Sequence, residues 1–461
     1  MLIVGESFYT QSELSRIAEQ TKYEKIYLSE YIWQTRYIDG KQVNVDPLIP
    51  IAATISEIFS DLLYGEFPQF DFQDDAINKS MFDFMNKRSL QDKDIKIDLL
   101  EASVYTSAQG MTFINLFKKD NETYWDIKKP NNCIWNNGFF GLEYFRYFDD
   151  ITTKAEAQQG KLVYSVQEHE LVGESNKQGT YRESIVTVNK NDKYKVMSIA
   201  VIEEKSTGLS FLPIVPIYNI KQMGLDVGKS DYTGKEQLFA EIDNRVDQIN
   251  NILQEHSEPW VAIPAGILDH NGQFNRQNGK MIEKSASSGN SDNSVDFFTW
   301  DSALQSQFAS IDKQIQLIMQ TSRLSPAFTG FTTNEGSGAD SGRALRWRSV
   351  TTLSALNRKQ IYQDQAIKKF FRMLTMMQDG FKDTDADKLN IIWADGLPLD
   401  DTELTEIVVK KVNNGLMSHL TGIEQLEEIN TPEAQAELDL IKSEQSQKAD
   451  IQARSVPPIS L

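Results

Sequence analysis

The chain contains almost no cysteine and little histidine. Cys133 is the single cysteine in 461 residues, so no disulfide can form within the chain. The four histidines lie far apart and show no metal-ligand spacing; they are His169, His256, His270 and His419. These absences exclude a disulfide-stapled scaffold and a Cys/His metal site, and they favour a reducing, cytosolic setting.

Long apolar runs are also missing. No stretch of the sequence approaches the roughly 20 apolar residues that a membrane-spanning helix needs. The first residues, MLIVGESFYTQSE, lack a basic region and hold only a short apolar run, so we expect no signal peptide. The sequence therefore predicts a soluble, cytoplasmic chain with no membrane partner.

Positive charge is scarce. Lys and Arg number 47 against 66 Asp and Glu, which gives a formal net charge of −19. Such a surface does not hold the phosphates of nucleic acid tightly. It does not exclude a protein that lets DNA slide past.

A nucleotide-binding motif is missing as well, although one stretch resembles it. Residues 333–349, TNEGSGADSGRALRWRS, are dense in Gly and Ser and run into a helical pattern. A P-loop needs a Lys beside a Ser or Thr and a preceding buried strand, whereas a helix end and Pro326 precede these glycines. We therefore interpret Ser325 to Asp340 as a flexible loop between two helices, with Asp340 or Ser341 as the N-cap of the second.

Catalytic constellations are absent from the sequence too. Paired aspartates lie beside turn and helix-start signals, where capping explains them; the pairs are Asp74–Asp75, Asp149–Asp150 and Asp400–Asp401. His256 and His270 have no Ser or Cys motif near them that would complete a hydrolytic triad. We predict no enzyme activity, no metal site and no cofactor.

The N-terminal half is expected to be helical first and β-structured next. Helices are predicted shortly after the capping pattern Thr10–Glu13, over 48–64 and over about 92–105. Residues 110 to about 220 hold short runs rich in Val, Ile, Thr and aromatics, which predict antiparallel strands. Together with its length, this pattern predicts an α+β, helix-rich chain that forms either about three domains or one elongated, multi-part subunit.

Two helices with narrow apolar stripes are predicted in the second half, in residues 234–255 and 302–321. The stripes are Leu238, Ile242, Val246, Ile249 and Leu253, then Leu304, Phe308, Ile311, Ile315 and Ile318. Two β-like runs, WVAIPAGIL and VDFFTW, lie between them, which predicts a stalk with a small β tip. Because so narrow a stripe suits few neighbours, we interpret the pair as a self-association surface; the alternative is an intramolecular hairpin with no assembly role.

A long helix is predicted from Gly342 to Met377. No proline interrupts it, and its second half carries one apolar face made of Ile367, Phe370, Phe371, Leu374 and Met377. Its first half gathers positive charge that is unusual in this acidic chain, at Arg343, Arg346, Arg348 and Arg358.

Four strings now resemble one protein family. They are LLYGEFP (62–68), GKSDYTGKEQLFAEIDNRVDQINN (228–251), DSGRALRWRS (340–349) and LMSHLTGIEQLEEINTPEAQAELDLI (416–441). The last is a helix-turn-helix pattern with capping signals at Thr421–Glu424 and Thr431–Pro432. In this order and spacing, over most of the chain, they resemble the portal proteins of tailed double-stranded DNA bacteriophages, in particular those of phages that infect Gram-positive hosts.

The resemblance implies a division of the chain into the parts of a portal subunit. The implied parts are a wing (1–225), two stem helices (226–258 and 301–324), a β clip between them (259–300), a tunnel loop (325–341), a long wing helix with a following strand (342–399), and a crown with a tail (400–461).

The resemblance also implies a function and partners. Twelve copies would form a ring at one capsid vertex, through which double-stranded DNA is packaged and ejected. The implied partners are the large subunit of the terminase motor, the major capsid and scaffolding proteins, and a head-completion or adaptor protein. The chain would assemble in the host cytoplasm and end in the virion.

Candidate functional residues follow from these parts. The tunnel-loop candidates are Thr329, Phe331, Thr332, Thr333, Asn334 and Glu335, and the stem-channel candidates are Lys235, Arg245 and Lys313. The clip candidates for docking the terminase are His270, Phe274, Arg276, Lys280 and Lys284, and the basic start of the wing helix is Arg343, Arg346 and Arg348. For the stem cations the alternative is that they are solvated or pair with acidic residues.

Two other classes stay open at this stage. One is a different ring or connector component of a virion, which would share self-assembly but lack the order of tunnel loop and long helix. The other is a nucleotide-dependent enzyme that uses residues 333–342, and it predicts that ATP or NAD raises the melting temperature.

Overall fold

The computed structural model describes most of the chain. The described residues are 1–38, 41–45, 49–138, 141–173, 177–257, 260–264, 281–284, 296–298, 304–329, 342–394, 401–427 and 434–443. They divide into two compact units, residues 1–331 with 351–396 and residues 332–350 with 397–461. We call them unit 1 and unit 2.

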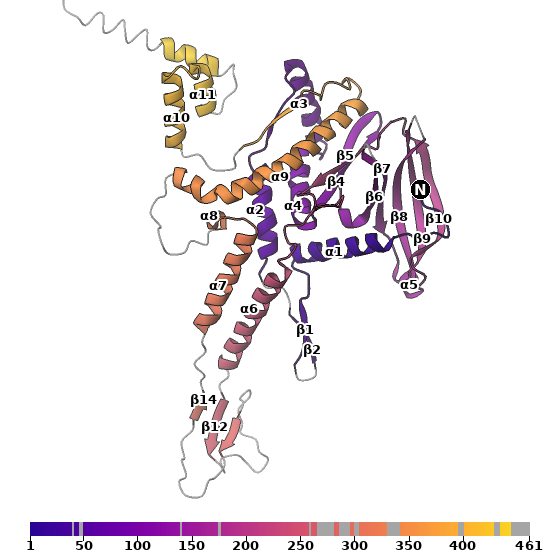
Figure 1. Cartoon of the computed structure of the whole chain (residues 1–461), viewed down its shortest axis with the longest axis vertical. Helices are drawn as coiled ribbons and strands as arrows, with labels where there is room; N and C mark the ends of the chain where they lie inside the picture. Colours follow the sequence, from indigo (N-terminus) through magenta and orange to yellow (C-terminus); the bar gives the residue numbers. More distant parts are fainter. Residues whose placement is uncertain are drawn as a thin grey trace, which may run out of the picture. The chain divides into compact units, whose positions relative to one another are not determined.

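Four helices of unit 1 precede its large sheets (Figure 1). They are α1 (Gln11–Tyr27), α2 (Ile51–Tyr64), α3 (Asp75–Ser89) and α4 (Ile95–Gln109). Thr10 caps α1 in a capping box with Glu13, and Asp74 caps α3, as the sequence predicts. Periodicity predicts α1, α2 and α4 but not α3, because α3 buries little more than Met81 on its apolar side.

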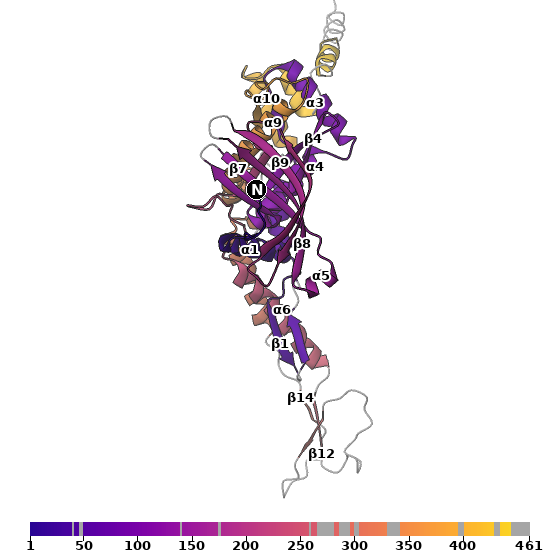
Figure 2. The ribbon, with the colours of Figure 1, turned by 90° about the vertical axis from the view of Figure 1, so that its right-hand side faces the viewer.

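Antiparallel strands follow the helices, as predicted for residues 110 to about 220. A five-stranded sheet has the order β10–β9–β8–β7–β6, with strands at Lys195–Ser206, Gln178–Asn189, Lys161–Val172, Gly141–Asp150 and Cys133–Gly138. A three-stranded sheet has the order β11–β4–β5, with strands at Ile214–Tyr218, Met111–Lys119 and Glu122–Lys128. A short helix, α5 (Lys154–Gln158), and a 3₁₀ turn, η1 (Pro130–Asn132), interrupt the strands. Figure 2 shows the larger sheet as a twisted layer.

The two sheets of unit 1 pack through aromatic side chains. The rings of Phe113 on β4 and Phe145 on β7 lie 5.0 Å apart between centroids. The N-terminal segment covers another part of the larger sheet, where Phe8 stacks on Tyr164 at 4.9 Å, and the backbone N of Phe8 donates to the carbonyl of Tyr194 at 2.8 Å. Burial of such rings is the main source of stability in this region.

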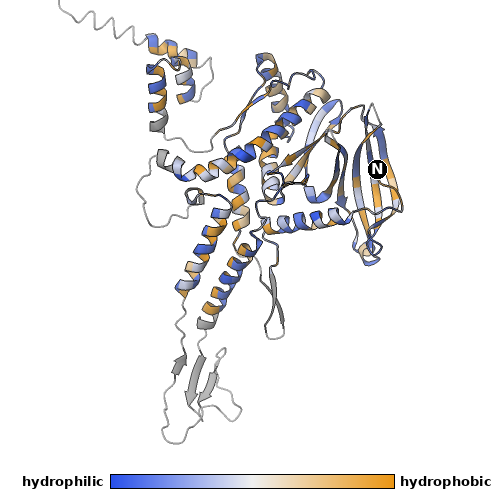
Figure 3. Cartoon of the chain, viewed as in Figure 1, coloured by the Kyte–Doolittle hydropathy of each residue, from blue (hydrophilic) through white to orange (hydrophobic). Residues whose placement is uncertain are grey.

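The long helix α9 (Gly342–Met377) has the bounds that the sequence predicts. The predicted apolar face is confirmed, because Phe371 and Leu374 are fully buried and the ring of Phe370 lies 5.4 Å from that of Trp125 on β5. The same core includes the last turn of α2, a helix that is largely apolar in the view of Figure 3. After α9, β15 (Asn390–Ile392) pairs antiparallel with β3 (Gln69–Asp71).

The second half of unit 1 contains the two helices predicted around 234–255 and 302–321. They are α6 (Glu236–Ser257) and α7 (Leu304–Thr321), which run side by side (Figure 1) and are followed by α8 (Pro326–Thr329). The two predicted β runs form β12 (Trp260–Pro264) and β14 (Asp296–Phe298), which pair antiparallel, and β13 (Met281–Lys284) joins β12 in parallel. A hairpin that periodicity does not predict, β1 (Gln34–Ile38) with β2 (Lys41–Val45), contacts α6.

Unit 2 contains both helical segments that the sequence predicts within residues 416–441, namely α11 (His419–Glu427) and a helix over residues 434–443. Helix α10 (Asp401–Asn413) contacts α11, and Gly422 allows close approach because a Cβ there would lie 3.2 Å from side chains of α10. The predicted capping signal at Thr421–Glu424 is wrong. The cap is Ser418, whose hydroxyl accepts from the backbone N of Thr421 at 3.0 Å, so Thr421 already lies inside the helix. Thr431 and Pro432 lie outside the described residues.

Candidate functional site at the base of the α6–α7 hairpin

The apolar stripes of α6 and α7 are buried at one end of the hairpin and exposed at the other. Ile242 and Ile318 are fully buried against α1 and α2. At the opposite end, Leu253 is 48 % exposed and Phe308 is 52 % exposed. Between these ends Ile249 and Ile311 are still buried, and Leu304 at the tip end of α7 is partly buried, so within one chain the stripes are covered at the base and only partly covered toward the tip.

A buried ion pair lies at this base. Lys359 of α9 is 3 % exposed, and its Nζ contacts Asp231 Oδ2 at 2.5 Å and also donates to Asn219 Oδ1. The ammonium lies 4.2 Å from the ring centroid of Phe59 on α2. Burial lowers the pKa of Lys359, opposed by the carboxylate of Asp231.

The ion pair continues into a chain of hydroxyls. Ser107 of α4 donates its hydroxyl hydrogen to Asp231 Oδ2 at 2.7 Å, and its Oγ lies within hydrogen-bond distance, 3.0 Å, of Ser56 Oγ of α2. Ser56 in turn shares a hydrogen bond of 2.6 Å with the hydroxyl of Tyr232. Because α9, α4, α2 and the segment leading into α6 all supply members, movement of one of these elements requires rearrangement of buried polar groups.

Gly228, the first glycine of the GKSDYTG string, packs closely against the backbone at the end of α4. A Cβ at Gly228 would lie 1.7 Å from the carbonyl oxygen of Gly110, and one at Gly110 would lie 2.4 Å from that of Gly228. Gly110 also has φ +90°, a conformation that favours glycine. Close backbone contact between the end of α4 and residue 228 thus positions Asp231.

Helix α9 also bonds to the segment that follows the C-terminal end of α7. The buried hydroxyl of Thr352 donates to the carbonyl of Arg323 at 2.9 Å and accepts from the backbone N of Ser325 at 2.8 Å. Further along α9, Gln363 accepts from the hydroxyl of Tyr64 on α2 at 3.1 Å. Thr352, Lys359 and Gln363 occupy one stripe of α9, so along a single face this helix bonds to the segment after α7, to the segment before α6 and to α2.

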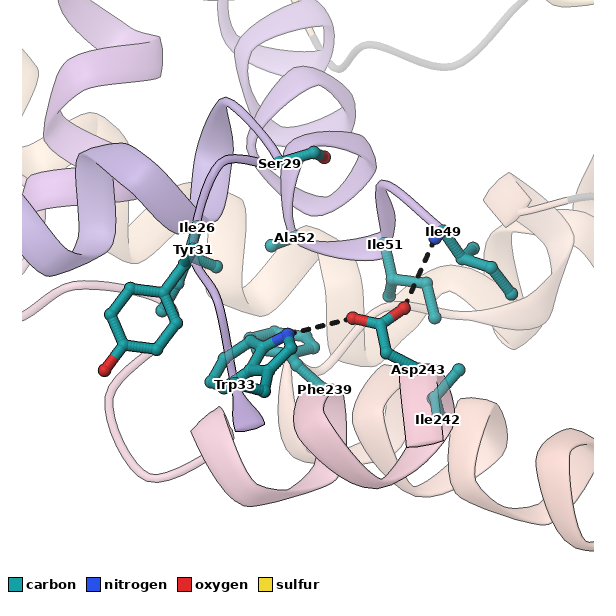
Figure 4. A pocket seen from close by; sticks show the side chains of 10 residues that line it. All are labelled: Ile26, Ser29, Tyr31, Trp33, Ile49, Ile51, Ala52, Phe239, Ile242 and Asp243. Atoms are coloured by element: carbon teal, nitrogen blue, oxygen red, sulfur yellow. Dashed lines mark hydrogen bonds between the residues drawn. The ribbon is translucent and has the colours of Figure 1, made fainter. Parts of the chain in front are cut away.

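Asp243 of α6 anchors the β1–β2 hairpin (Figure 4). Its carboxylate accepts from Trp33 Nε1 at 2.9 Å and from the backbone N of Ile49 at 3.4 Å. Trp33 precedes β1 and Ile49 follows β2, so both ends of the hairpin are tied to α6. The adjoining cavity, about 20 Å³, is too small for a ligand.

The described part of the chain offers no group of three or more His, Cys, Asp or Glu side chains placed to hold a metal ion. Cys133 is buried, and burial raises the pKa of its thiol, so it packs as an apolar residue. Within the same described ranges, no helix is long and apolar enough to cross a membrane.

Comparison with protein families decides the assignment. Residues 8–450 match the family model described as phage portal protein, SPP1 Gp6-like. The chain belongs to this phage portal protein family. It is therefore a structural protein of the phage particle, of the head–tail connector class.

One solved structure similar to this portal chain is titled "Neck of native GTA particle computed with C12 symmetry". Its sequence is 8 % identical, the match covers 92 % of this chain and 95 % of that chain, and the TM-score is 0.48. None of the curated proteins matches the chain.

The three stem cations of the portal chain lie in different surroundings. Lys235, 9 % exposed, donates to the carbonyl of Asp231, and burial lowers its pKa. Arg245 bonds to Glu241 Oε1 at 2.9 Å and reaches Gln307 of α7 at 3.2 Å, so it links the two helices. Lys313 is exposed. That these residues face a DNA channel stays a prediction, and Lys313 is its exposed member.

The structure describes only some of the other predicted site residues. Thr329 ends α8 and Lys284 ends β13, and Arg348 is exposed on α9, where Arg343 and Arg346 also lie. The remaining tunnel-loop and clip candidates fall outside the described residues; they are Phe331, Thr332, Thr333, Asn334, Glu335, His270, Phe274, Arg276 and Lys280.

The residues at the base of the hairpin are those that sequence reasoning misses. Lys359 and Gln363 interrupt an otherwise apolar stripe of α9 that includes Leu356 and Ile367. A charged residue in the apolar face of a helix signals a buried partner, because an unpaired charge there is costly. Nothing in the sequence alone identifies that partner as Asp231.

Proposed function

We propose that twelve copies of this chain form a closed ring at one vertex of a phage head, and that double-stranded DNA enters and leaves through the central hole. The family match over residues 8–450 carries this proposal. Identical subunits that join through heterologous contacts form a closed ring when the rotation from one copy to the next closes on itself.

The α6–α7 hairpin supports the ring. Leu253 and Phe308, each about half exposed in one chain, lie toward the tip of the hairpin, where the stripes are only partly covered. A neighbouring copy would bury these side chains, each contributing about 1 kcal/mol or more to association. This favours self-association over a hairpin without an assembly role.

Charge supports a passive channel. Each copy carries a formal charge of −19, so a ring repels phosphates as a whole. An exposed cation such as Lys313, repeated in every copy, would supply one narrow ring of positive charge. We infer that residues 325–341 line the narrowest part and that the chain has no catalytic activity, with a separate terminase ATPase supplying the energy.

The part names belong to the same proposal. Residues 259–300 act as the clip that contacts the terminase and later an adaptor protein, residues 1–225 and 342–399 as the wing, and residues 400–461 as the crown. Capsid and scaffolding proteins join the ring in the host cytoplasm, and the host is a Gram-positive bacterium.

A deletion tests the channel assignment. In a phage that carries this chain, removal of residues 329–338 is expected to leave rings in the heads but to stop DNA packaging, measured as the DNA content of purified particles. Removal of residues 455–461 is the control and should leave packaging unchanged. If the first deletion gives heads without rings, or heads that still fill with DNA, the segment does not line the channel.

A further inference from the structure

One long edge of the five-stranded sheet has no partner strand over most of its length. Strand β10 forms one margin of this sheet, and its only neighbour in the sheet is β9 (Figure 1). In the described part of the chain, no backbone group outside β9 bonds to the backbone of residues 197–206. A strand has hydrogen-bonding groups on both sides, so alternate N–H and C=O groups of this segment face outward with no strand to bond.

The side chains of this edge are apolar where edge strands of soluble proteins are often charged. Residues 197–202 read MSIAVI and contain no charge, proline or glycine. Val201 is 50 % exposed and Ile202 is 62 % exposed. Charges begin only at Glu203, and two register shifts in the pairing with β9 leave the preceding residues uncharged. An exposed, uncharged edge rich in Ile and Val is a template for another strand.

The start of the same edge already binds an extended segment. Gly5 N donates to the carbonyl of Val196 at 2.9 Å, and Val196 N donates to the carbonyl of Glu6 at 2.8 Å. Ser7 lies opposite Lys195 in an antiparallel bridge. The edge from residue 197 onward therefore continues a line along which β10 already pairs with a segment from outside the sheet.

A neighbouring copy of the chain does not suit the free part of this edge. Pairing of β10 with β10 of another copy is an isologous contact that closes after two copies, whereas a ring needs heterologous contacts. The opposite margin of the sheet, β6, is covered by α1, where Arg16 donates to the carbonyls of Pro130 at 2.9 Å and Cys133 at 2.6 Å. These contacts favour a different polypeptide as the occupant.

We propose that residues 197–205 of β10 bind an extended segment of a second protein, which adds a strand to the sheet. Main-chain hydrogen bonds supply affinity in this mode of recognition, and side chains supply specificity. Apolar side chains of the added strand lie beside Val201 and Ile202. A basic side chain lies near Glu204, which is exposed and forms no ion pair in the described ranges, whereas Glu203 pairs with Lys205 at 2.9 Å. The choice of a second protein over a second copy rests on the proposed ring; the free edge does not.

The test uses the fluorescein-labelled peptide KVTVTVTK, titrated against the full chain and followed by fluorescence anisotropy. Two modified forms carry N-methyl groups on alternate residues, so that each form blocks one edge of the extended peptide. Because a docked strand presents only one edge to β10, one form should bind normally and the other roughly tenfold more weakly or not at all. Hydrogen exchange of residues 197–205 should slow when the unmodified peptide binds. The measurement needs no ring, so its failure is distinct from failure of the ring.

Variants locate the site. Ile202→Lys places a charge on the edge, so it should weaken binding of the unmodified peptide roughly tenfold or more, while the melting temperature changes little because the side chain is exposed. Val172→Lys, at a 53 % exposed position on the inner strand β8, is the matched control and should bind normally.

Four results would each overturn the proposal. They are no binding of the unmodified peptide, equal binding of the two N-methylated forms, normal binding by Ile202→Lys, and pairs of copies or of rings in sedimentation that Ile202→Lys separates. The last result would show that a second copy occupies the edge.

Discussion

Replacement of Lys359 by methionine tests whether the ion pair at the base of the hairpin holds α9 to the start of α6. Methionine keeps the apolar contact with Phe59 but removes the charge that faces Asp231. Asp231 then keeps only the donor from Ser107 among its side-chain partners described above, and its carboxylate is 14 % exposed. Loss of one partner of a buried pair costs about 3–5 kcal/mol, so we expect the free energy of unfolding to fall by about 3 kcal/mol or more.

The double variant, Lys359→Met with Asp231→Asn, separates the interaction energy of the ion pair from the separate effects of the two residues. Asp231→Asn alone should also destabilise, because it leaves the ammonium of Lys359 buried without an opposite charge. With both substitutions neither charge is buried alone, so the loss should be smaller than the sum of the single losses by about 1–3 kcal/mol. Lys368→Met on the same helix is the control, because the Lys368–Asp364 pair is 45 % and 29 % exposed and should cost about 0.5 kcal/mol or less.

The assay is urea unfolding at one fixed protein concentration, since assembly would change the apparent stability. Hydrogen exchange of residues 352–377 reports the local effect on α9. If Lys359→Met costs no more than Lys368→Met, or if the two single losses simply add, the ion pair does not couple α9 to α6.

Three further predictions concern buried groups nearby and in the sheets. Thr352→Val should lower the free energy of unfolding by about 1–3 kcal/mol, since it removes the hydroxyl that joins α9 to the segment between α7 and α8, whereas the exposed Thr351→Val should change it little; urea unfolding measures both. Gly228→Ala should cost at least about 1–3 kcal/mol, because its Cβ overlaps a backbone carbonyl, and normal expression with an unchanged melting temperature would contradict the packing. His169 has a pKa lowered to about 4, so the folded state binds fewer protons than the unfolded state below pH 6.5, and stability falls as pH drops from 6.5 to 4. When the free energy of unfolding is measured between pH 6.5 and 4, His169→Gln should reduce this loss of stability by about 3 kcal/mol. His419→Gln, at an exposed position on α11, should leave the loss unchanged.

Elements with strong periodicity could be predicted from the sequence, and elements held by tertiary contacts could not. Helix α9 contains no proline and carries one apolar face in its second half, so its bounds at Gly342 and Met377 follow from the pattern. Helix α3 exposes most of its side chains, and the β1–β2 hairpin depends on the carboxylate of Asp243, which lies about two hundred residues away in the sequence. Periodicity carries no record of such distant partners.

The candidate site likewise has features that local patterns predict and contacts that only the structure shows. The stripes of α6 and α7 and the family strings point to the stem, because both are local patterns. The bond between Lys359 and Asp231 joins residues 128 positions apart, and the apolar stripe of α9 shows only that a partner must exist. The packing of Gly228 against Gly110 likewise appears only once both backbones are placed.

Electron microscopy of the purified protein, with class averages of particles seen end-on, tests the central claim most directly. The account predicts closed rings of twelve copies with a central hole wide enough for duplex DNA, formed by the chain alone or once capsid and scaffolding proteins are added. Chains that remain single at high concentration, with and without those proteins, would contradict it.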